Sequence, residues 1–293
     1  MNLKDSLQMA AGELRSAGVP EPELDAWYLL EYVSGWNRAS YYADPERELT
    51  ARQQEKYKNC IRKRAERVPL QHITGEQEFM GLTFHVNEHV LIPRQDTEIL
   101  VEEALEQFRE GRVPAGDPGR GGSEILDLCT GSGCILLSVL YYARQMKDVS
   151  VRGTGSDLSE KALETAEENA KRLDIRAEFV QGDLFENLKG RYAMILSNPP
   201  YIRSAEIGGL QPEVRDHDPR MALDGSEDGL IFYRKIIRAG GLHLENNGIL
   251  MFEIGCDQAA DVSGMLREHG FSDIMVKKDL AGLDRVVYGR YSK

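Results

Sequence analysis

The sequence predicts an α/β protein, in which a small helical bundle precedes a domain with a mostly parallel, doubly wound sheet. Apolar residues recur at helical spacing through the first 67 residues, and strand-like segments alternate with helix-like segments from residue 124 onward. A chain of 293 residues also exceeds what one small core organises, which favours two domains of unequal size. We expect a helical bundle over residues 1–75, a β-hairpin linker over 76–93 and the α/β domain over 94–293.

The helical bundle is indicated by amphipathic segments with clear breaks between them. Apolar residues keep helical spacing in LDAWYLLEYVSG (Leu24–Gly35), and the breaks fall at GVPEPE and YYADPERELT. Thr50 precedes a long polar helix and is expected to cap it, because its hydroxyl accepts a hydrogen bond from an unpaired backbone N–H. The pattern predicts about four or five helices. The basic run Lys56–Arg67 is interpreted as a solvated helix face, with a contact for RNA or the ribosome as the alternative.

The linker and the first helix of the second domain follow. The segment Gln77–Pro93 alternates apolar and polar residues and carries Gly81 and Asn87, as a β-hairpin does. A helix is expected at Thr97–Phe108. The stretch Arg109–Glu124 is rich in glycine and proline and is interpreted as a mobile surface loop, whose length the pattern does not explain.

The rest of the chain alternates between the two element types. Strands are expected at EILDLC, VRGTGSD, AEFVQGD, YAMILSN and GILMFEIG. Helices are expected near Ile135–Arg144, at Ser159–Leu173 and near Leu230–Ala239. The tail FSDIMVKKDLAGLDRVVYGRY predicts two more strands joined by a turn.

Charge and cysteine usage narrow the class of protein. Residues 1–75 hold 11 basic and 11 acidic side chains, so the remainder carries the whole net charge of −12. An acidic domain repels duplex phosphates, which disfavours DNA as a partner. Cys60, Cys129, Cys134 and Cys256 have no metal-ligand spacing, so we expect reduced thiols and no metal. We expect a cytoplasmic protein, because neither a membrane-helix pattern nor a signal-peptide pattern is visible.

A ligand pocket is predicted where the first strand of the second domain meets its helix. In ILDLCTGSGCI (Ile125–Ile135), Gly131 and Gly133 let the backbone approach a ligand closely. The spacing differs from GxGxxG, which makes a bound pyrophosphate a weaker expectation. Asp157 ends the next strand, where a carboxylate accepts both hydroxyls of a ribose. The alternatives are that the glycines serve only a tight turn and that Asp157 is only a helix cap.

The motif DLCTGSG, Asp157 and the NPPY motif after the fourth strand together resemble the class I, Rossmann-like methyltransferases that use S-adenosylmethionine. The resemblance implies S-adenosylmethionine as the cofactor and S-adenosylhomocysteine as its product. The residues that it implies at the cofactor are Cys129, Thr130, Gly131, Ser132, Gly133, Asp157, Asp183, Leu184 and Asn198.

The two prolines of NPPY have a chemical explanation. An amide nitrogen is a poor nucleophile with two N–H donors, and an enzyme activates it by aiming two acceptors at those hydrogens. Asn198 Oδ1 and the carbonyl of Pro199 are expected to be these acceptors. Pro200 stiffens the backbone, because it has no N–H and restricts the residue before it. Tyr201 is expected to present a flat face to a planar amide or base.

Longer segments resemble one family, the protein-(glutamine-N5) methyltransferases of the HemK/PrmC type. They are PLQHITGEQEFMGLTFHVNEHVLIPRQDTE (Pro69–Glu98), EVRDHDPRMALDGSEDGLIFYR (Glu213–Arg234), FEIG and AGLDRVVYGR. The resemblance implies methylation of the glutamine in the Gly-Gly-Gln motif of bacterial peptide chain release factors, which modulates translation termination. It also implies that the release factor contacts both the helical bundle and the catalytic domain.

Some positions carry open alternatives or depart from the family. Arg94 and Glu98 are expected either to contact the substrate or to be structural partners of the loop Asp216–Arg220. Phe79 is either a core residue of the hairpin or a wall of the pocket. The family often has glycine at the position of Cys129 and tryptophan at that of Leu184. Leu184 offers adenine an apolar surface with less stacking area, so cofactor affinity is expected to be weaker here.

Two other functions are considered. A nucleic-acid adenine methyltransferase needs a basic cleft or a target-recognition domain, and the acidic second domain shows neither. A binding module that retains the fold without the chemistry is disfavoured by the intact NPPY motif and Asp157. Oligomeric state and preference among release factors have no sequence signal.

Overall fold

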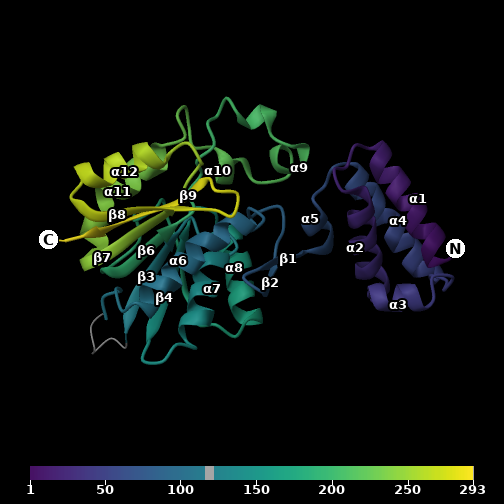
Figure 1. Cartoon of the computed structure of the whole chain (residues 1–293), viewed down its shortest axis with the longest axis horizontal. Helices are drawn as coiled ribbons and strands as arrows, with labels where there is room; N and C mark the ends of the chain where they lie inside the picture. The colour runs from purple at the N-terminus through teal and green to yellow at the C-terminus, as the bar shows by residue number, and fades with distance from the viewer. Residues whose placement is uncertain (116–121, 293) are drawn as a thin grey trace. The chain divides into compact units, whose positions relative to one another are not determined.

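A computed structural model describes residues 1–115 and 122–292 (Figure 1). The chain divides into two compact units. The helical unit contains Met1–Glu76 together with Gln211–His217, and the α/β unit contains Gln77–Leu210 and Asp218–Lys293. The short segment Gln211–His217 therefore groups with the helical unit although it lies far along the chain, a grouping for which the sequence pattern carries no signal.

The helical unit contains short helices of the expected kind. They are α1 (Leu3–Ser16), α2 (Pro22–Ser34), α3 (Arg38–Ala43), α4 (Ala51–Ala65), α5 (Leu70–Thr74) and α9 (Pro212–Arg215). The cap at Thr50 is confirmed: its hydroxyl accepts from the backbone N–H of Gln53 at 3.3 Å, and the Gln53 side chain accepts from the Thr50 N–H at 3.0 Å. Such a capping box satisfies two backbone donors at once.

The core of the helical unit is apolar with polar anchors. Leu14, Leu29 and Leu30 are fully buried between the helices. The hydroxyl of Tyr57 on α4 donates to the backbone carbonyl of Ala26 on α2 at 2.8 Å, which satisfies a buried polar group.

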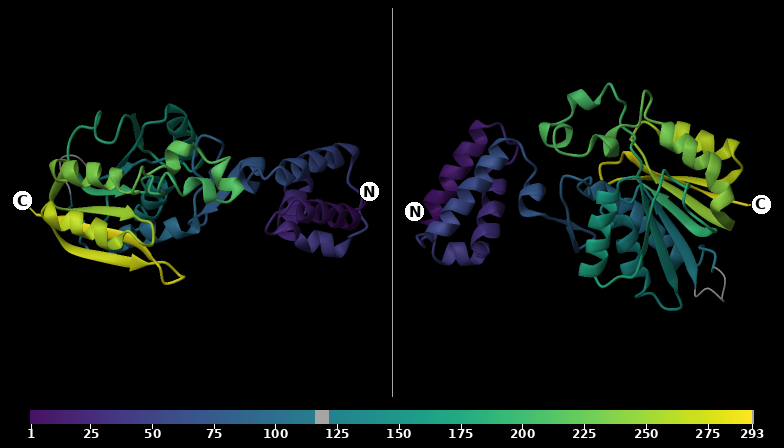
Figure 2. Two further views of the ribbon diagram at one scale, coloured as in Figure 1. Left: turned by 90° about the horizontal axis from the view of Figure 1, so that it is seen from above. Right: turned by 180° about the vertical axis from the view of Figure 1, so that it is seen from behind.

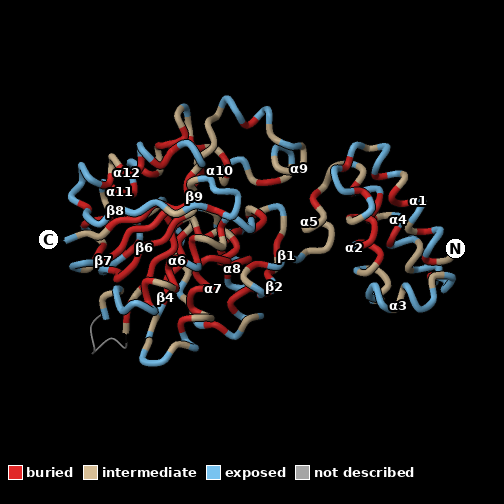
Figure 3. Tube along the Cα trace, viewed as in Figure 1, coloured by how far each residue is buried: buried red, intermediate tan, exposed pale blue. Residues whose placement is uncertain are grey.

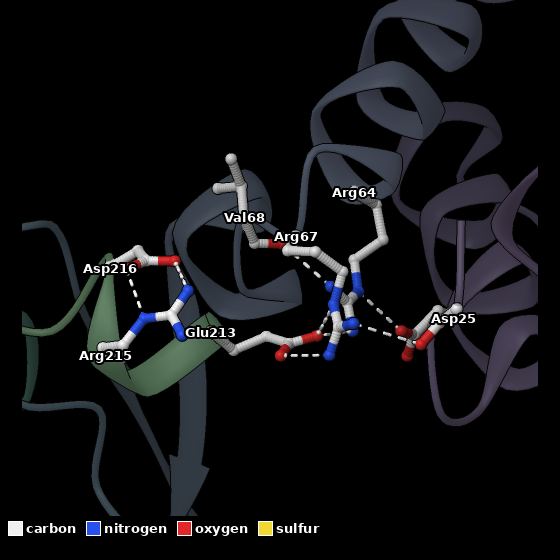
Figure 4. Close-up of polar contacts among 8 residues, drawn as sticks. Asp25, Arg64, Arg67, Val68, Glu213, Arg215 and Asp216 are labelled. Carbon is white, nitrogen blue, oxygen red and sulfur yellow. Dashed lines mark hydrogen bonds and ion pairs between the residues drawn. The ribbon is translucent and has the colours of Figure 1, made fainter. Parts of the chain in front are cut away.

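A partly buried ion-pair network links α9 to α4 within the helical unit (Figure 4). Arg64 donates to Asp25 at 2.7 Å and to Glu213 at 2.8 Å. Arg67 donates to both carboxylate oxygens of Glu213, at 2.7 and 2.6 Å, the bidentate geometry that guanidinium favours. Burial acts to raise the pKa of Glu213, but hydrogen bonds from Arg67 and Arg64 prevail and lower it to about 2.

The predicted β-hairpin is confirmed and is shorter than the segment that predicts it. Its strands are β1 (Glu76–Phe79) and β2 (Leu82–His85). Phe79 is 1% exposed and meets Phe84 edge to face at 6.1 Å, so it packs in the core. The turn is anchored at Met80, whose N–H donates to Glu98 and whose carbonyl accepts from Tyr142, both at 2.6 Å.

Within residues 122–292, seven strands form one sheet in the order β5-β4-β3-β6-β7-β9-β8. These strands are β3 (Ser123–Leu128), β4 (Val151–Asp157), β5 (Glu178–Gln181), β6 (Tyr192–Ser197), β7 (Leu244–Glu253), β8 (Phe271–Lys278) and β9 (Asp284–Tyr291). The pairs from β5 to β7 are parallel, and β9 pairs antiparallel with both β7 and β8. The predicted fold class is thus confirmed.

Helices cover both faces of this sheet (Figure 2). One face carries α6 (Glu98–Arg109), α7 (Cys134–Ala143) and α8 (Glu160–Arg172), and the other carries α11 (Ile231–His243) and α12 (Ala259–Glu268). The short element η1 (Gln95–Thr97) directly precedes α6. The short elements η3 (Ile207–Gly209) and α10 (Arg220–Leu223) lie in the connections.

Successive side chains of a strand point to opposite faces of the sheet, and each face has its own hydrophobic core. In β7, Ile249 and Met251 pack under α6 and α7, whereas Leu250 and Phe252 pack under α11 and α12. The central strands are therefore apolar on both faces, as parallel strands with helices on each side require, and they are buried along most of their length (Figure 3).

Several expected boundaries differ from the structure. The helix expected near Leu230–Ala239 continues to His243, and β7 starts directly after it. The helix α12 (Ala259–Glu268) is not among the helices that the sequence pattern predicts. Residues 116–121 of the expected surface loop lie outside the described residues. In the part of the chain that the structure describes, no helix is long and apolar enough to cross a membrane.

Candidate active site

A cavity of about 250 Å³ opens at the carboxyl ends of β3, β4, β5 and β6. In a doubly wound sheet this is the edge where ligands bind, beside the point at which the strand order reverses. Here the order reverses at β3, which has β4 on one side and β6 on the other. The expected site residues that line the cavity are Arg94, Cys129, Thr130, Gly131, Ser132, Asp157, Asp183, Leu184, Asn198 and Pro200.

The turn after β3 forms one wall. The N–H of Thr130 donates to the carbonyl of Ser156 at 3.0 Å, which fixes the turn against the end of β4. Gly131 has a φ of +54°, and a Cβ built on it meets no atom within 4 Å. Its backbone therefore faces open space at the cavity, where a ligand can approach closely. Gly133 does not line the cavity and is the N-terminal cap of α7.

Asp157 connects this turn to the next loop. One carboxylate oxygen accepts from the N–H of Gly131 and the other from the N–H of Ser159, both at 2.9 Å. Burial raises the pKa of Asp157, and these backbone hydrogen bonds partly oppose that rise. Ser159, not Asp157, caps α8 through its side chain. Each carboxylate oxygen retains acceptor capacity for a hydroxyl in the cavity.

The ends of β4 and β5 supply an apolar rim. Leu158 is 56% exposed although it is apolar, and it lines the cavity together with Leu184. Asp183 points its carboxylate toward Lys235, with 3.7 Å between Oδ2 and Nζ. Leu158 and Phe232 line the cavity without having been singled out in the sequence. An apolar residue directly after a strand-end aspartate was the available signal for Leu158.

The NPPY motif follows β6. Asn198 and Pro200 line the cavity, whereas Pro199 and Tyr201 are not part of its lining. Asn198 Nδ2 donates to the hydroxyl of Thr97 at 3.4 Å. The hydroxyl of Tyr201 donates to Glu253 at 3.3 Å, and burial raises the pKa of this phenol.

The loop that contains Gly229 packs closely against the backbone of the NPPY motif. Gly229 has a φ of +76°, and a Cβ there would lie 2.4 Å from the carbonyl oxygen of Tyr201. Gln258 reinforces the contact, because its Nε2 donates to the same carbonyl at 3.1 Å. The backbone of NPPY is therefore held by neighbours as well as by its own prolines.

Arg94 and Glu98 occupy different surroundings. Arg94 lines the cavity and also forms an ion pair at 2.6 Å with Asp218, whose side chain is fully buried. Glu98 is not part of the lining and accepts the hydrogen bond from Met80 in the hairpin. Whether either side chain contacts a substrate stays a prediction.

Two carboxyl groups that the sequence analysis did not single out are buried beside the cavity. Burial raises the pKa of Asp127 to about 7, although a hydrogen bond from Thr130 opposes the rise. Burial likewise raises the pKa of Glu253 to about 7, against a hydrogen bond from Thr97 and the charge of Arg285. Perturbed carboxyl groups beside a cleft are candidates for functional roles. Among the described residues, no group of three or more His, Cys, Asp or Glu side chains could hold a metal ion.

Comparisons with known proteins agree with this architecture. The family described as PrmC N-terminal domain matches residues 5–75, and the family described as Methyltransferase small domain matches residues 117–209. A 16S rRNA N2 methyltransferase of T. thermophilus, solved with AdoMet and guanosine, superimposes with a TM-score of 0.50 at 16% identity, covering 74% of this chain and 49% of that one. At that identity the likeness concerns the fold alone.

Relatives of known name are similar over nearly the whole chain. A release factor glutamine methyltransferase of Agrobacterium fabrum is 41% identical over 280 residues, covering 95% of this chain and 93% of that protein. One of Geobacter sulfurreducens is 40% identical over 289 residues, covering 98% and 96%.

Proposed function

Because the chain belongs to the family of release factor glutamine methyltransferases, we propose that it methylates the side-chain amide nitrogen of the glutamine in the Gly-Gly-Gln motif of bacterial peptide chain release factors. The methyl donor in this proposal is S-adenosylmethionine. The observation that carries the proposal is the position of Asn198, which lines the same cavity as Asp157 and the turn after β3. The acceptor group and the donor pocket are therefore adjacent.

The cavity suits an adenosine with an attached amino acid. When bound, S-adenosylmethionine supplies an electrophilic methyl group on a sulfonium sulfur. Asp157 accepts the ribose hydroxyls in this proposal, since it lines the cavity and each of its oxygens, which accepts one backbone N–H, has acceptor capacity left. Leu158 and Leu184 offer apolar surface for the adenine. The open space at Gly131 leaves room for the ligand at the backbone.

The acceptor side of the reaction needs orientation more than acid–base chemistry. Asn198 Oδ1 and the carbonyl of Pro199 accept the two N–H bonds of the glutamine amide, which aims the lone pair of its nitrogen at the methyl carbon. The nitrogen forms the new N–C bond as the S–C bond breaks, and it then loses one proton to solvent. Arg94, at the cavity and paired with Asp218, is placed to contact the substrate backbone in this proposal.

The test uses radiolabelled S-adenosylmethionine with three acceptors: a release factor, the same factor with its Gly-Gly-Gln glutamine replaced by alanine, and duplex DNA. Label on the intact factor alone is the expected result. Label on DNA would refute the proposed substrate, and label on the alanine variant would refute the proposed acceptor residue. Calorimetric titration with S-adenosylmethionine measures cofactor binding without turnover. A protein that binds S-adenosylmethionine but labels none of the three acceptors would be a binding protein without the chemistry. The cytoplasmic location expected from the sequence stays a prediction.

A further inference from the structure

We propose that Thr97 and Glu253 are positioning residues, which fix the side-chain amide of Asn198 so that its oxygen, and not its nitrogen, faces the acceptor amide. The inference rests on the proposed function and adds two residues to its machinery. Neither residue comes from the motif that carries the chemistry: Thr97 ends η1, and Glu253 ends β7.

The need for such a device follows from the chemistry of asparagine. The two ends of its amide have nearly the same shape, but one accepts hydrogen bonds and the other only donates them. A half-turn of the Asn198 amide would present an NH₂ group to the NH₂ group of a glutamine, so two donors would face each other. The enzyme therefore needs a neighbour that distinguishes the two orientations.

Thr97 makes that distinction. It is 3% exposed, it lines the cavity, and its Oγ1 lies 3.4 Å from Asn198 Nδ2. A hydroxyl has one proton to donate, and in this proposal Thr97 directs it to the Glu253 carboxyl, whose charged form the same hydroxyl stabilises. Its oxygen is then an acceptor toward Asn198, which selects the orientation that turns Nδ2 to Thr97 and leaves Oδ1 for the substrate.

Glu253 keeps Thr97 in this donating state. Glu253 is 2% exposed, and its Oε1 also accepts from the hydroxyl of Tyr201 at 3.3 Å. Its Oε2 has no hydrogen-bond partner among the described residues. When the carboxyl is protonated, the proton can reside on Oε2 while Oε1 remains an acceptor, so the chain of hydrogen bonds persists in both protonation states. The charged or titratable groups that act on Glu253 are Arg285, Asp96 and Tyr201.

The parallel register explains why these residues meet. Ser197 of β6 pairs with Phe252 of β7, so Asn198 and Glu253 are the next residues on adjacent strands. Thr97 comes from the turn that precedes α6: its Oγ1 accepts from Asn198 Nδ2, and its hydroxyl stabilises the charged form of the Glu253 carboxyl. The proposed chain of hydrogen bonds thus joins three segments that are far apart in the sequence.

The test measures turnover of the full chain with a release factor and radiolabelled S-adenosylmethionine. Thr97→Val removes only the hydroxyl, and Glu253→Met removes the acceptor from the other end. Each is expected to lower kcat about tenfold, the scale of one hydrogen bond, with the Kd for S-adenosylmethionine unchanged by calorimetry. Thr97→Ser and Glu253→Gln retain the donor and the acceptor, and they are expected to stay within about threefold of the parent protein.

The decisive comparison uses the Asn198→Ala background. A positioning residue has nothing to orient there, so Thr97→Val is expected to cause no further loss. An additional tenfold loss in that background would mean that Thr97 has a merely structural role, and it would overturn the proposal. Unchanged turnover in Thr97→Val alone would also overturn it.

A matched control separates this effect from the loss of any buried threonine hydroxyl. Thr165 is also 3% exposed and accepts a hydrogen bond from an asparagine, Asn87 Nδ2, at 3.0 Å. Thr165→Val is expected to leave kcat unchanged, and an equal loss there would overturn the specific role of Thr97.

If Thr97→Val unfolds the protein, as seen by circular dichroism, Glu253→Met alone and in the Asn198→Ala background gives the same comparison. A parent protein that labels no release factor would refute the proposed function itself, which is a separate outcome.

Discussion

The ion-pair network of the helical unit makes a quantitative prediction for Glu213→Gln. Glu213 has an ordinary pKa of 4.5 and a folded pKa of about 2, and its side chain is 13% exposed. At 1.36 kcal/mol per pKa unit, this difference corresponds to about 3 kcal/mol of stability when the carboxyl is ionised in both states. The variant should lose about this amount at pH 6, because Arg64 and Arg67 lose a charged, partly buried acceptor.

The pH dependence of the loss follows from the sign of the shift. A lowered folded pKa stabilises above the unfolded value of 4.5, and this contribution disappears as the pH falls toward 2. The difference between the parent protein and Glu213→Gln should therefore shrink from about 3 kcal/mol at pH 6 to about 1.5 kcal/mol at pH 3.

The assay is urea unfolding followed by tryptophan fluorescence. The chain has 2 tryptophans, and both Trp27 and Trp36 lie in the helical unit, so the signal reports that unit selectively. Glu23→Gln is the control, because it removes an ion-paired glutamate of the same unit whose side chain is 63% exposed. Exposed pairs contribute little, so its effect should stay below about 1 kcal/mol. A loss for Glu213→Gln no larger than for the control, or a loss independent of pH, would refute the reasoning.

Three further predictions concern the site. Asn198→Ala should lower turnover at least ~10²-fold, the scale of one positioned polar group, while calorimetry shows little change in cofactor affinity; full turnover would contradict the role of Asn198. Asp157→Ala should weaken S-adenosylmethionine binding about tenfold or more in the same titration, and an unchanged Kd would exclude the ribose contact. Gly229→Ala places a Cβ 2.4 Å from the carbonyl oxygen of Tyr201 and should lower both the melting temperature and kcat, whereas an unchanged kcat would show that the NPPY backbone tolerates displacement.

The sequence predicts elements well where local pattern decides the structure. The strand β4 has the expected bounds, because its ends are marked by Asp157 and by a polar loop. The cap at Thr50 and the hairpin around Gly81 are likewise local signals, read from neighbouring residues. The NPPY motif and the turn after β3 reach one cavity because parallel strands end at the same edge of a sheet.

Other features depend on contacts that no local pattern records. The position of Asn198 beside Thr97, and its place next to Glu253 at the ends of paired strands, depend on strand order and register, which single-sequence periodicity does not give. The sequence left open whether Arg94 contacts the substrate or pairs with the loop Asp216–Arg220. The structure gives Arg94 both a position at the cavity and an ion pair with the buried Asp218, so the two roles are not exclusive.

The late position of Glu213 in the chain has a consequence for biosynthesis. Glu213 pairs with Arg67 and Arg64, which precede it by 146 and 149 residues. At about 5–20 residues per second, the ribosome adds that stretch in roughly 7–30 s. During this interval the helices α1 to α5 have left the peptidyl-transferase centre before Glu213 exists, and Asp25 is the acidic partner that Arg64 already has among the described residues. The first unit to be synthesised therefore reaches its full stability only after most of the second unit has been made.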